Sequence, residues 1–280
     1  MNPGIHHCVT FPDYQKITAV NPSLAKHARL SMKHYRHARD TVPPDPPTDA
    51  MVLGSATHCC VLEPDTFPLR YILWDGGTRR GRTWDAFVEA NAGKTPLRED
   101  DYARCCAMRD AVRSHPAAAR IFADQHRVEE SLVWTDTPTG TLCKGRVDLL
   151  GPRIVDLKTC RSAQDRHIVN AVSTYGYHIS MGAYYDGLLT LTGHALQAAL
   201  IFVESSPPHD VVVKVLMDEA LLRGRDIWHE LLAKIAECNA SGLWPGVAPE
   251  ESALDLPAWE MGVENRAIDF GDDDLEESNG

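Results

Sequence analysis

The chain has 280 residues, of which 44% are hydrophobic, and its formal net charge is −11. This length and composition allow one large folded domain or two small ones, and they exclude a wholly disordered chain. The N-terminal sequence MNPGIHHCVTF lacks the basic and apolar regions of a secretory signal peptide, and no apolar run approaches the length of a membrane span. We therefore expect a soluble protein with no membrane partner.

The acidic charge is concentrated near the C-terminus. Residues 250–280 contain eleven acidic residues and one basic residue, a net charge of −10, which leaves −1 for the preceding 249 residues. The overall charge therefore does not exclude a nucleic acid as ligand. The eight cysteines include two adjacent pairs and no CxxC motif. This pattern favours free thiols in a reducing cytoplasm over disulfides or a zinc ribbon.

The first part of the chain is predicted to be mainly helical. Asn21 and Pro22 are typical of a helix N-terminus, and the predicted helix covers residues 21–39. After a proline-rich connector, a second helix is predicted to end near Pro64. Residues 77–83, GTRRGRT, are predicted to form a mobile basic loop. A third helix is predicted from residue 98 to about residue 114, before a break at Pro116.

Strand patterns follow. The predicted elements are strands at residues 129–136, 141–150 and 153–159, a long helix at 164–190, strands at 195–204 and 210–217, and a helix at 218–239. This order predicts a mixed α/β fold, with a central mixed sheet flanked by helices and an N-terminal helical part. We expect a single domain at residues 1–262, with its mainly helical part at 20–125 and its α/β core at 126–240, and a disordered acidic tail at 263–280.

Two groups of cations are candidates for phosphate binding. The first group is spaced by three, four and three residues, which would place it on one face of the predicted helix: Lys26, Arg29, Lys33 and Arg36. The second group lies in the basic loop: Arg79, Arg80 and Arg82. Trp84 follows this loop and could stack on a base. The alternative is a merely solvated cationic surface, although residues 22–39 contain no acidic residue.

The segment CKGRVDLLGPRIVDLKTC, residues 143–160, places three charges within two apolar strands. Strand alternation directs Asp156 and Lys158 to the same face, and the turn at Gly151-Pro152 can bring Asp148 beside them. Two converging carboxylates repel each other unless a cation lies between them, and oxygen ligands suit Mg²⁺ or Mn²⁺. The spacing therefore indicates metal-assisted phosphodiester hydrolysis. The alternative is a strand-end carboxylate and a surface ion pair.

The same segment resembles the PD-(D/E)XK nuclease signature, with Val147 in the proline position before Asp148 and with Asp156 in the D/E position. Three further segments are similar to RecE-type exonuclease VIII and to phage-type exonucleases: LGSATHCCVLEPDTF, EESLVWTDTPTGTLCKGRVDLL and YGYHISMGAYYDG. They occur in the family's order across residues 20–245. The resemblance implies a restriction-endonuclease-like core.

The resemblance also implies roles for individual residues. Asp148 and Asp156 would be metal ligands together with the carbonyl of Leu157, and His58 would be a further ligand. Lys158 would position or activate the attacking water. Glu129 corresponds to an acid on the family's first strand, and it would act in catalysis by holding a second metal or its water.

Each role has an alternative. Glu130 competes with Glu129, because strand alternation turns only one of the two inward. His58 could be a hydrogen-bonded core residue. On the tyrosine-rich helix, Ser180 stands where the family usually has a glutamine, and Tyr184 matches the family's tyrosine. Both would contact the DNA end or the metal site, or Tyr184 would be a core aromatic.

By this resemblance we expect an Mg²⁺- or Mn²⁺-dependent exonuclease that degrades linear double-stranded DNA from its ends, 5′ to 3′, in the cytoplasm of a bacterial host. The family implies a homo-oligomeric ring, a tetramer or trimer, and a single-strand-annealing recombination protein as partner. The alternatives are a single-strand-specific or endonucleolytic relative, or a DNA-binding and assembly module that is catalytically weakened by Ser180.

Overall fold

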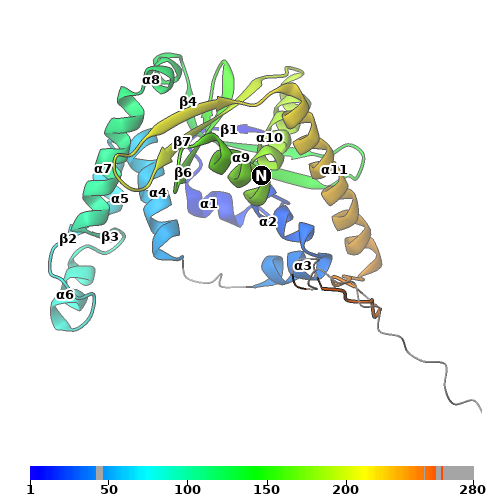
Figure 1. The fold of residues 1–280 in the computed structure, drawn as a ribbon, viewed down its shortest axis with the longest axis horizontal. Helices are drawn as coiled ribbons and strands as arrows, with labels where there is room; N and C mark the ends of the chain where they lie inside the picture. Colours follow the sequence, from blue (N-terminus) through cyan, green and yellow to red (C-terminus); the bar gives the residue numbers. More distant parts are fainter. Residues whose placement is uncertain (42–46, 249, 257–259, 261–280) are drawn as a thin grey trace, which may run out of the picture. The chain divides into compact units, whose positions relative to one another are not determined.

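Among the residues that the structure describes (1–41, 47–248, 250–256 and 260), six strands form one mixed sheet. In this computed structural model the strand order is β1-β4-β5-β6-β7-β8, with β6 and β7 parallel and the other neighbours antiparallel (Figure 1). The bounds are β1 Gly4–His6, β4 Arg127–Thr135, β5 Leu142–Leu150, β6 Arg153–Cys160, β7 Gln197–Glu204 and β8 Val211–Val215. The predicted mixed sheet is confirmed, and β1 is an additional strand that the sequence analysis missed.

Helices cover both faces of the sheet because the central strands are apolar on both sides. In β7, Ala198, Leu200 and Phe202 belong to one buried cluster, whereas Ala199, Ile201 and Val203 belong to the other. The first cluster packs against α10 (Tyr177–Thr192) and α11 (Asp218–Ser241). The second packs against α4 (Asp49–Leu62), α7 (Glu99–Ser114) and α8 (Pro116–Ala123) (Figure 1).

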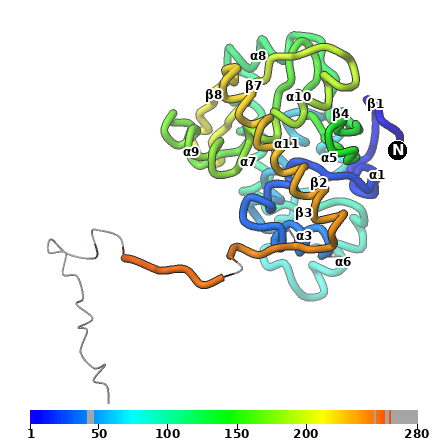
Figure 2. Tube along the Cα trace, turned by 90° about the vertical axis from the view of Figure 1, so that its right-hand side faces the viewer, coloured from blue at the N-terminus to red at the C-terminus, as the bar shows by residue number. Residues whose placement is uncertain are grey.

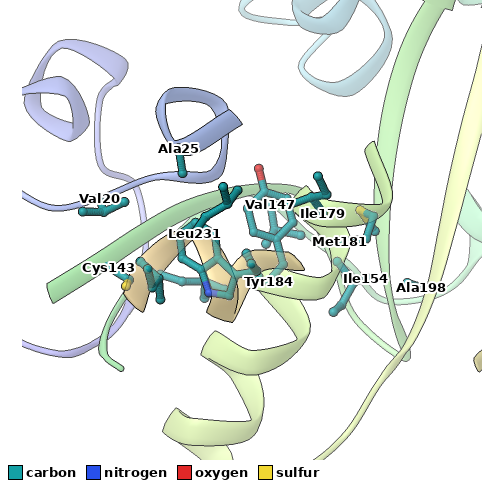
Figure 3. Packing of buried hydrophobic residues seen from close by; sticks show 14 of the residues in the cluster. Val20, Ala25, Cys143, Val147, Ile154, Ile179, Met181, Tyr184, Ala198 and Leu231 are labelled. Carbon is teal, nitrogen blue, oxygen red and sulfur yellow. The ribbon is translucent and has the colours of Figure 1, made fainter. Parts of the chain in front are cut away.

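Two helices meet backbone to backbone on the first face. α10 and α11 approach each other at Gly182 and Gly224, where neither glycine has room for a side chain. Figure 3 shows Ile179, Met181 and Tyr184 of α10 in the cluster with Val147 of β5 and Ile154 of β6. The close contact fixes α10 against the sheet, and α10 carries Ser180 and Tyr184.

The predicted helix at residues 164–190 is two helices in the structure. α9 (Asp165–Tyr175) ends at Gly176, whose φ of 63° is left-handed, and α10 begins at the next residue. A glycine in this conformation is the common way to end a helix. The break turns α10 onto the sheet while α9 buries only Ile168.

The predicted helix at residues 21–39 is also interrupted. It consists of α2 (Pro22–Ala25), the 3₁₀ helix η1 (Lys26–Arg29) and α3 (Met32–Asp40). The Ser31 side chain caps α3 by accepting a hydrogen bond from the His34 N–H. The four cations therefore do not form the continuous stripe that a single helix would give.

The N-terminal segment is tied to the sheet by a buried lysine. Lys144 of β5 donates hydrogen bonds to the carbonyls of Tyr14 (2.9 Å), Gln15 (3.3 Å) and Ile17 (2.7 Å). These carbonyls end α1 (Phe11–Lys16), where a cation is favourable. Val20 then joins β5: its N–H donates a hydrogen bond to the carbonyl of Leu142 (2.9 Å), and its carbonyl accepts one from the Lys144 N–H (2.8 Å).

Residues 67–98 form a small group of helices and strands that precedes α7 in the chain. It contains α5 (Phe67–Arg70), β2 (Tyr71–Trp74), α6 (Arg82–Ala90) and β3 (Thr95–Arg98), with β2 and β3 paired in parallel. Figures 1 and 2 show α6 away from the six-stranded sheet. The basic loop predicted at residues 77–83 therefore leads into a helix at Arg82.

The described residues up to Gly246 form one compact unit. The predicted end of the domain at residue 262 lies outside the described residues and stays a prediction. The predicted tail at 263–280 lies outside the described residues. Within the described part of the chain, no helix has the length and apolar character needed to cross a bilayer.

Candidate metal centre

The candidate site lies where two neighbouring strands separate. β5 and β6 are paired only at Leu149–Val155 and Leu150–Ile154, beside the turn that joins them. Asp148 and Asp156 are the next residues beyond these pairs, so both carboxylates lie at the opening. The other edge of β5 remains paired with β4, and Val20 occupies part of the edge that β6 leaves (Figure 3). The strand separation gives helices from both faces access to these carboxylates.

Asp148 is buried, with 7% of its surface exposed, and has two neighbours at the same oxygen. Its Oδ2 accepts a hydrogen bond from the Leu157 N–H (2.7 Å) and lies 3.4 Å from His58 Nδ1. Burial raises the pKa of Asp148 well above its ordinary value, and the nearby charge of Asp156 raises it further. A bound cation would favour the ionised form of this carboxylate.

His58 reaches the site from α4, on the second face of the sheet. Burial lowers the pKa of His58 to about 4, and the charge of Lys158 acts in the same direction. The imidazole is therefore neutral at pH 7 and can offer a nitrogen lone pair to a metal.

Glu129 completes a group of three potential ligands. One ligand atom from each of His58, Glu129 and Asp148 lies within 4.8 Å of the others. Glu129 lies between Val128 and Glu130, which pair with Leu149 and Val147 on either side of Asp148. Its φ of 57° is left-handed, a conformation that non-glycine residues rarely adopt. Its neighbour Glu130 is buried and ion-paired with His7 instead. Of the two competing acids, the structure thus brings Glu129 to the site.

Lys158 interacts with the two remaining predicted ligands, Asp156 and the carbonyl of Leu157. Its ammonium group forms an ion pair with Asp156 and donates a hydrogen bond to the carbonyl of Leu157 (3.2 Å). Although burial alone would lower the pKa of Lys158, the charges of Asp156 and Asp148 raise it above its ordinary value, so the side chain is charged. The predicted ligand set therefore divides into His58 and Asp148, which lie with Glu129, and Asp156 and the Leu157 carbonyl, which lie with Lys158.

The aromatic side of the site comes from α10. The Tyr177 ring is near two ammonium groups, 5.4 Å from that of Lys158 and 5.8 Å from that of Lys26. Tyr184 is buried against β5, where a Cβ on Gly145 would lie 2.7 Å from its ring. Ser180 is buried on the same helix. Tyr184 is thus part of the core as well as a neighbour of the site, because Asp156 and Asp148 both act on its pKa.

The first group of predicted DNA-binding cations is dispersed by the break in its helix. Lys26 lies beside Tyr177, and burial lowers its pKa to about 8. Arg29 donates to the carbonyls of residues 173 and 174 at the end of α9 (3.3 and 3.4 Å). Arg36 lies 3.5 Å from Asp40 and 5.8 Å from the Trp244 ring, whereas Lys33 is exposed. Only Lys26 of this group lies at the candidate site.

The second group of predicted DNA-binding cations lies in the small group of helices and strands at residues 67–98. Arg79 donates to the Pro96 carbonyl (3.1 Å), while Arg80 and Arg82 are exposed. Trp84 packs against Trp74, with ring centroids 5.2 Å apart, and against Phe87 at 6.4 Å. Trp84 is therefore partly buried, and its stacking on a base stays a prediction.

Arg146 is a site residue that the sequence analysis missed. It forms an ion pair with Glu129, and its Nη1 donates to the Val9 carbonyl (2.8 Å). The signal available in the sequence was its position two residues before Asp148, which places both on the same side of a strand. Spacing alone could not identify Glu129 as its partner.

The site residues fit a divalent metal, because one imidazole nitrogen and two carboxylates converge and a cation would offset the repulsion among the acids.

Sequence and structure comparisons add an independent finding. A family model described as a PDDEXK-like domain of unknown function (DUF3799) matches residues 23–254. A search of curated proteins found no match.

Several solved structures are similar to this chain, including the following two. One, described as a "Putative exonuclease" from Eubacterium rectale, is 14% identical, with a TM-score of 0.63 over 91% of this chain and 98% of that chain. The other, a phage related exonuclease from Haemophilus somnus 129PT, is 12% identical, with a TM-score of 0.37 over 80% of this chain and 96% of that one. The family match and the first structure confirm the predicted fold class, a PD-(D/E)XK core.

Proposed function

Because the chain belongs to this PDDEXK-like family, we propose that it is a nuclease that uses Mg²⁺ or Mn²⁺ to hydrolyse phosphodiester bonds of linear double-stranded DNA. The observation that carries the proposal is the convergence of His58, Glu129 and Asp148 beside the Asp156–Lys158 pair. The proposed substrate follows from the exonuclease resemblance and from the cations near the site. We further propose 5′-to-3′ cleavage, a ring-shaped homo-oligomer and an annealing partner.

Each side chain of the site would have a separate chemical role. His58, Glu129 and Asp148 would hold the cation, and Asp156 and the Leu157 carbonyl would complete its surroundings. A divalent cation at such a site polarises a phosphoryl oxygen and makes water more acidic. Lys158 would orient the attacking water by hydrogen bonding and would offset negative charge that develops on the phosphate. Tyr177 would keep the ammonium group of Lys158 directed into the site.

Lys158→Ala is expected to lower the rate of linear-duplex degradation by about 100- to 10,000-fold, because it removes both the hydrogen-bond donor and the charge. The assay compares linear 5′-phosphorylated duplex with closed circular DNA, in Mg²⁺ and in EDTA. Lys214→Ala is the matched control, since Lys214 pairs with Asp165 at the surface. It should retain full activity.

The substrates also separate the alternatives. Loss of the linear duplex alone, dependent on Mg²⁺ and Lys158, supports the exonuclease, and end-labelling then gives its polarity. Cutting of the circle would instead identify an endonuclease. Binding of DNA without any cleavage would contradict the proposal and favour a non-catalytic module, with Ser180→Gln as the first variant to test for restored activity.

Lys26→Ala is expected to weaken DNA binding more than Arg36→Ala. Lys26 lies near Lys158 and forms no ion pair with an acidic side chain in the described part of the chain, whereas Arg36 has Asp40 and Trp244 as partners. One lost phosphate contact reduces the slope of log affinity against log salt by about one. Binding to a labelled duplex is measured in Ca²⁺ between low and moderate salt. Equal slopes for the two variants would contradict a phosphate contact at Lys26.

A further inference from the structure

Arg146 pairs with one oxygen of a carboxylate that belongs to the candidate metal centre. Its Nε forms an ion pair with Glu129 Oε2, and the same carboxylate belongs to the group of potential ligands with His58 and Asp148. A carboxylate has two oxygens, so the ion pair leaves Oε1 for a metal. The guanidinium therefore stands where a second cation would otherwise bind Glu129.

The guanidinium is anchored independently of Glu129. Arg146 Nη1 donates to the carbonyl of Val9 (2.8 Å), and the charge lies 6.0 Å from the Phe11 ring and 5.9 Å from the Tyr14 ring. Only 12% of the side chain is exposed. The N-terminal segment therefore holds Arg146 in position at the site, and this position does not depend on the ion pair with Glu129 alone.

The charges of the site favour one divalent cation over two. With the carboxylates ionised, as a bound cation favours, Glu129, Asp148 and Asp156 contribute three negative charges, and Lys158 and Arg146 contribute two positive charges, so the net formal charge is −1. One divalent cation changes this to +1 and a second to +3. Two cations about 4 Å apart, as in two-metal nucleases, need more negative charge than this to offset their repulsion.

We propose that Arg146 is a positioning residue that holds Glu129 Oε2 and limits the centre to one divalent cation per chain. The proposal rests on the metal-dependent function proposed above. It predicts that removing the guanidinium charge frees Glu129 Oε2 and creates a second cation site.

The test is a titration of the full chain with Mn²⁺ in the absence of DNA, with free Mn²⁺ measured by electron paramagnetic resonance. The unaltered protein should bind one Mn²⁺ per chain and Arg146→Met two. Arg146→Lys, which keeps the charge, and Arg120→Met, which removes an exposed arginine from α8, should each bind one. The double variant Arg146→Met with Glu129→Gln should also return to one.

Several results would overturn the proposal. Two Mn²⁺ ions in the unaltered protein would do so without any variant, even if Arg146→Met failed to fold, and the nuclease function would then still stand. A single ion in folded Arg146→Met, or two in Arg146→Lys, would equally exclude the charge argument. Absence of Mn²⁺ binding would contradict both this inference and the metal-dependent function, and the linear-duplex assay would show the latter separately.

Discussion

Asp148→Asn is expected to lower the rate of DNA hydrolysis by at least about 1,000-fold and at the same time to stabilise the metal-free protein. The amide loses the charge that a cation needs, but its oxygen can still accept the hydrogen bond from the Leu157 N–H. Stability rises because the carboxylate is buried and lies near Asp156, which together raise its pKa. One pKa unit corresponds to about 1.4 kcal/mol, so we expect a gain of about 1 kcal/mol or more.

The pH dependence has a defined sign. The pKa of Asp148 in the folded state lies above its ordinary value of 3.8, so the folded protein binds this proton more tightly than the unfolded chain does. The stability contribution of Asp148 is therefore greatest below pH 3.8 and falls as the pH rises through the folded-state pKa. The Asp148→Asn variant does not lose stability in this way as the pH rises, because its amide does not ionise. Urea unfolding in EDTA at several pH values measures the difference, with exposed Asp226→Asn as the control. A variant less stable than the unaltered protein at pH 7 would contradict the prediction.

Gly224→Ala is expected to destabilise the protein by about 3 kcal/mol. A Cβ at this position would lie 2.0 Å from the carbonyl oxygen of His178 and 2.5 Å from its carbon, so α10 and α11 would have to separate. Gly182→Ala should act in the same way, because its Cβ would lie 2.4 Å from the backbone nitrogen of Arg225. Since α10 carries Tyr177 and Tyr184, activity should fall together with stability.

Urea unfolding with matched helical glycines tests this packing. A Cβ at Gly54 of α4 would meet only Thr159 Oγ1, at 3.8 Å, which is an ordinary contact. Gly54→Ala should therefore leave stability unchanged or raise it by about 0.5–1 kcal/mol, the usual preference for alanine in a helix. Equal effects of Gly54→Ala and Gly224→Ala would show that the α10–α11 contact can relax.

The sequence predicted best those features that depend on alternation within a strand. Asp156 and Lys158 share a strand face, and the short turn before them brings Asp148 close, so their proximity follows from local rules. His58 could be proposed only from the family resemblance, because its place depends on how α4 packs on the sheet. Arg146 was missed for the same reason, since its partners lie on β4 and in the N-terminal segment.

Two helix breaks were not predicted, and each changed the interpretation of nearby residues. Gly176 ends α9 with a left-handed backbone, and Ser31 begins α3 as its N-cap. Both signals are present in the sequence, but periodic apolar residues on either side concealed them. The consequence for the site is that Lys26 lies beside Tyr177, separate from Lys33 and Arg36.

The attachment of Val20 to β5 affects how far the chain can be shortened. The family match begins at residue 23, yet β1, α1 and Val20 all precede it. A protein trimmed to the matched region would lose the strand that covers the outer edge of β4 and the partner of β5 at Cys143. Uncovered strand edges pair with other chains, so such a fragment is prone to aggregation. The trimmed protein would also lose the Val9 carbonyl that anchors Arg146, so the residues that support the candidate site begin before the region matched by the family.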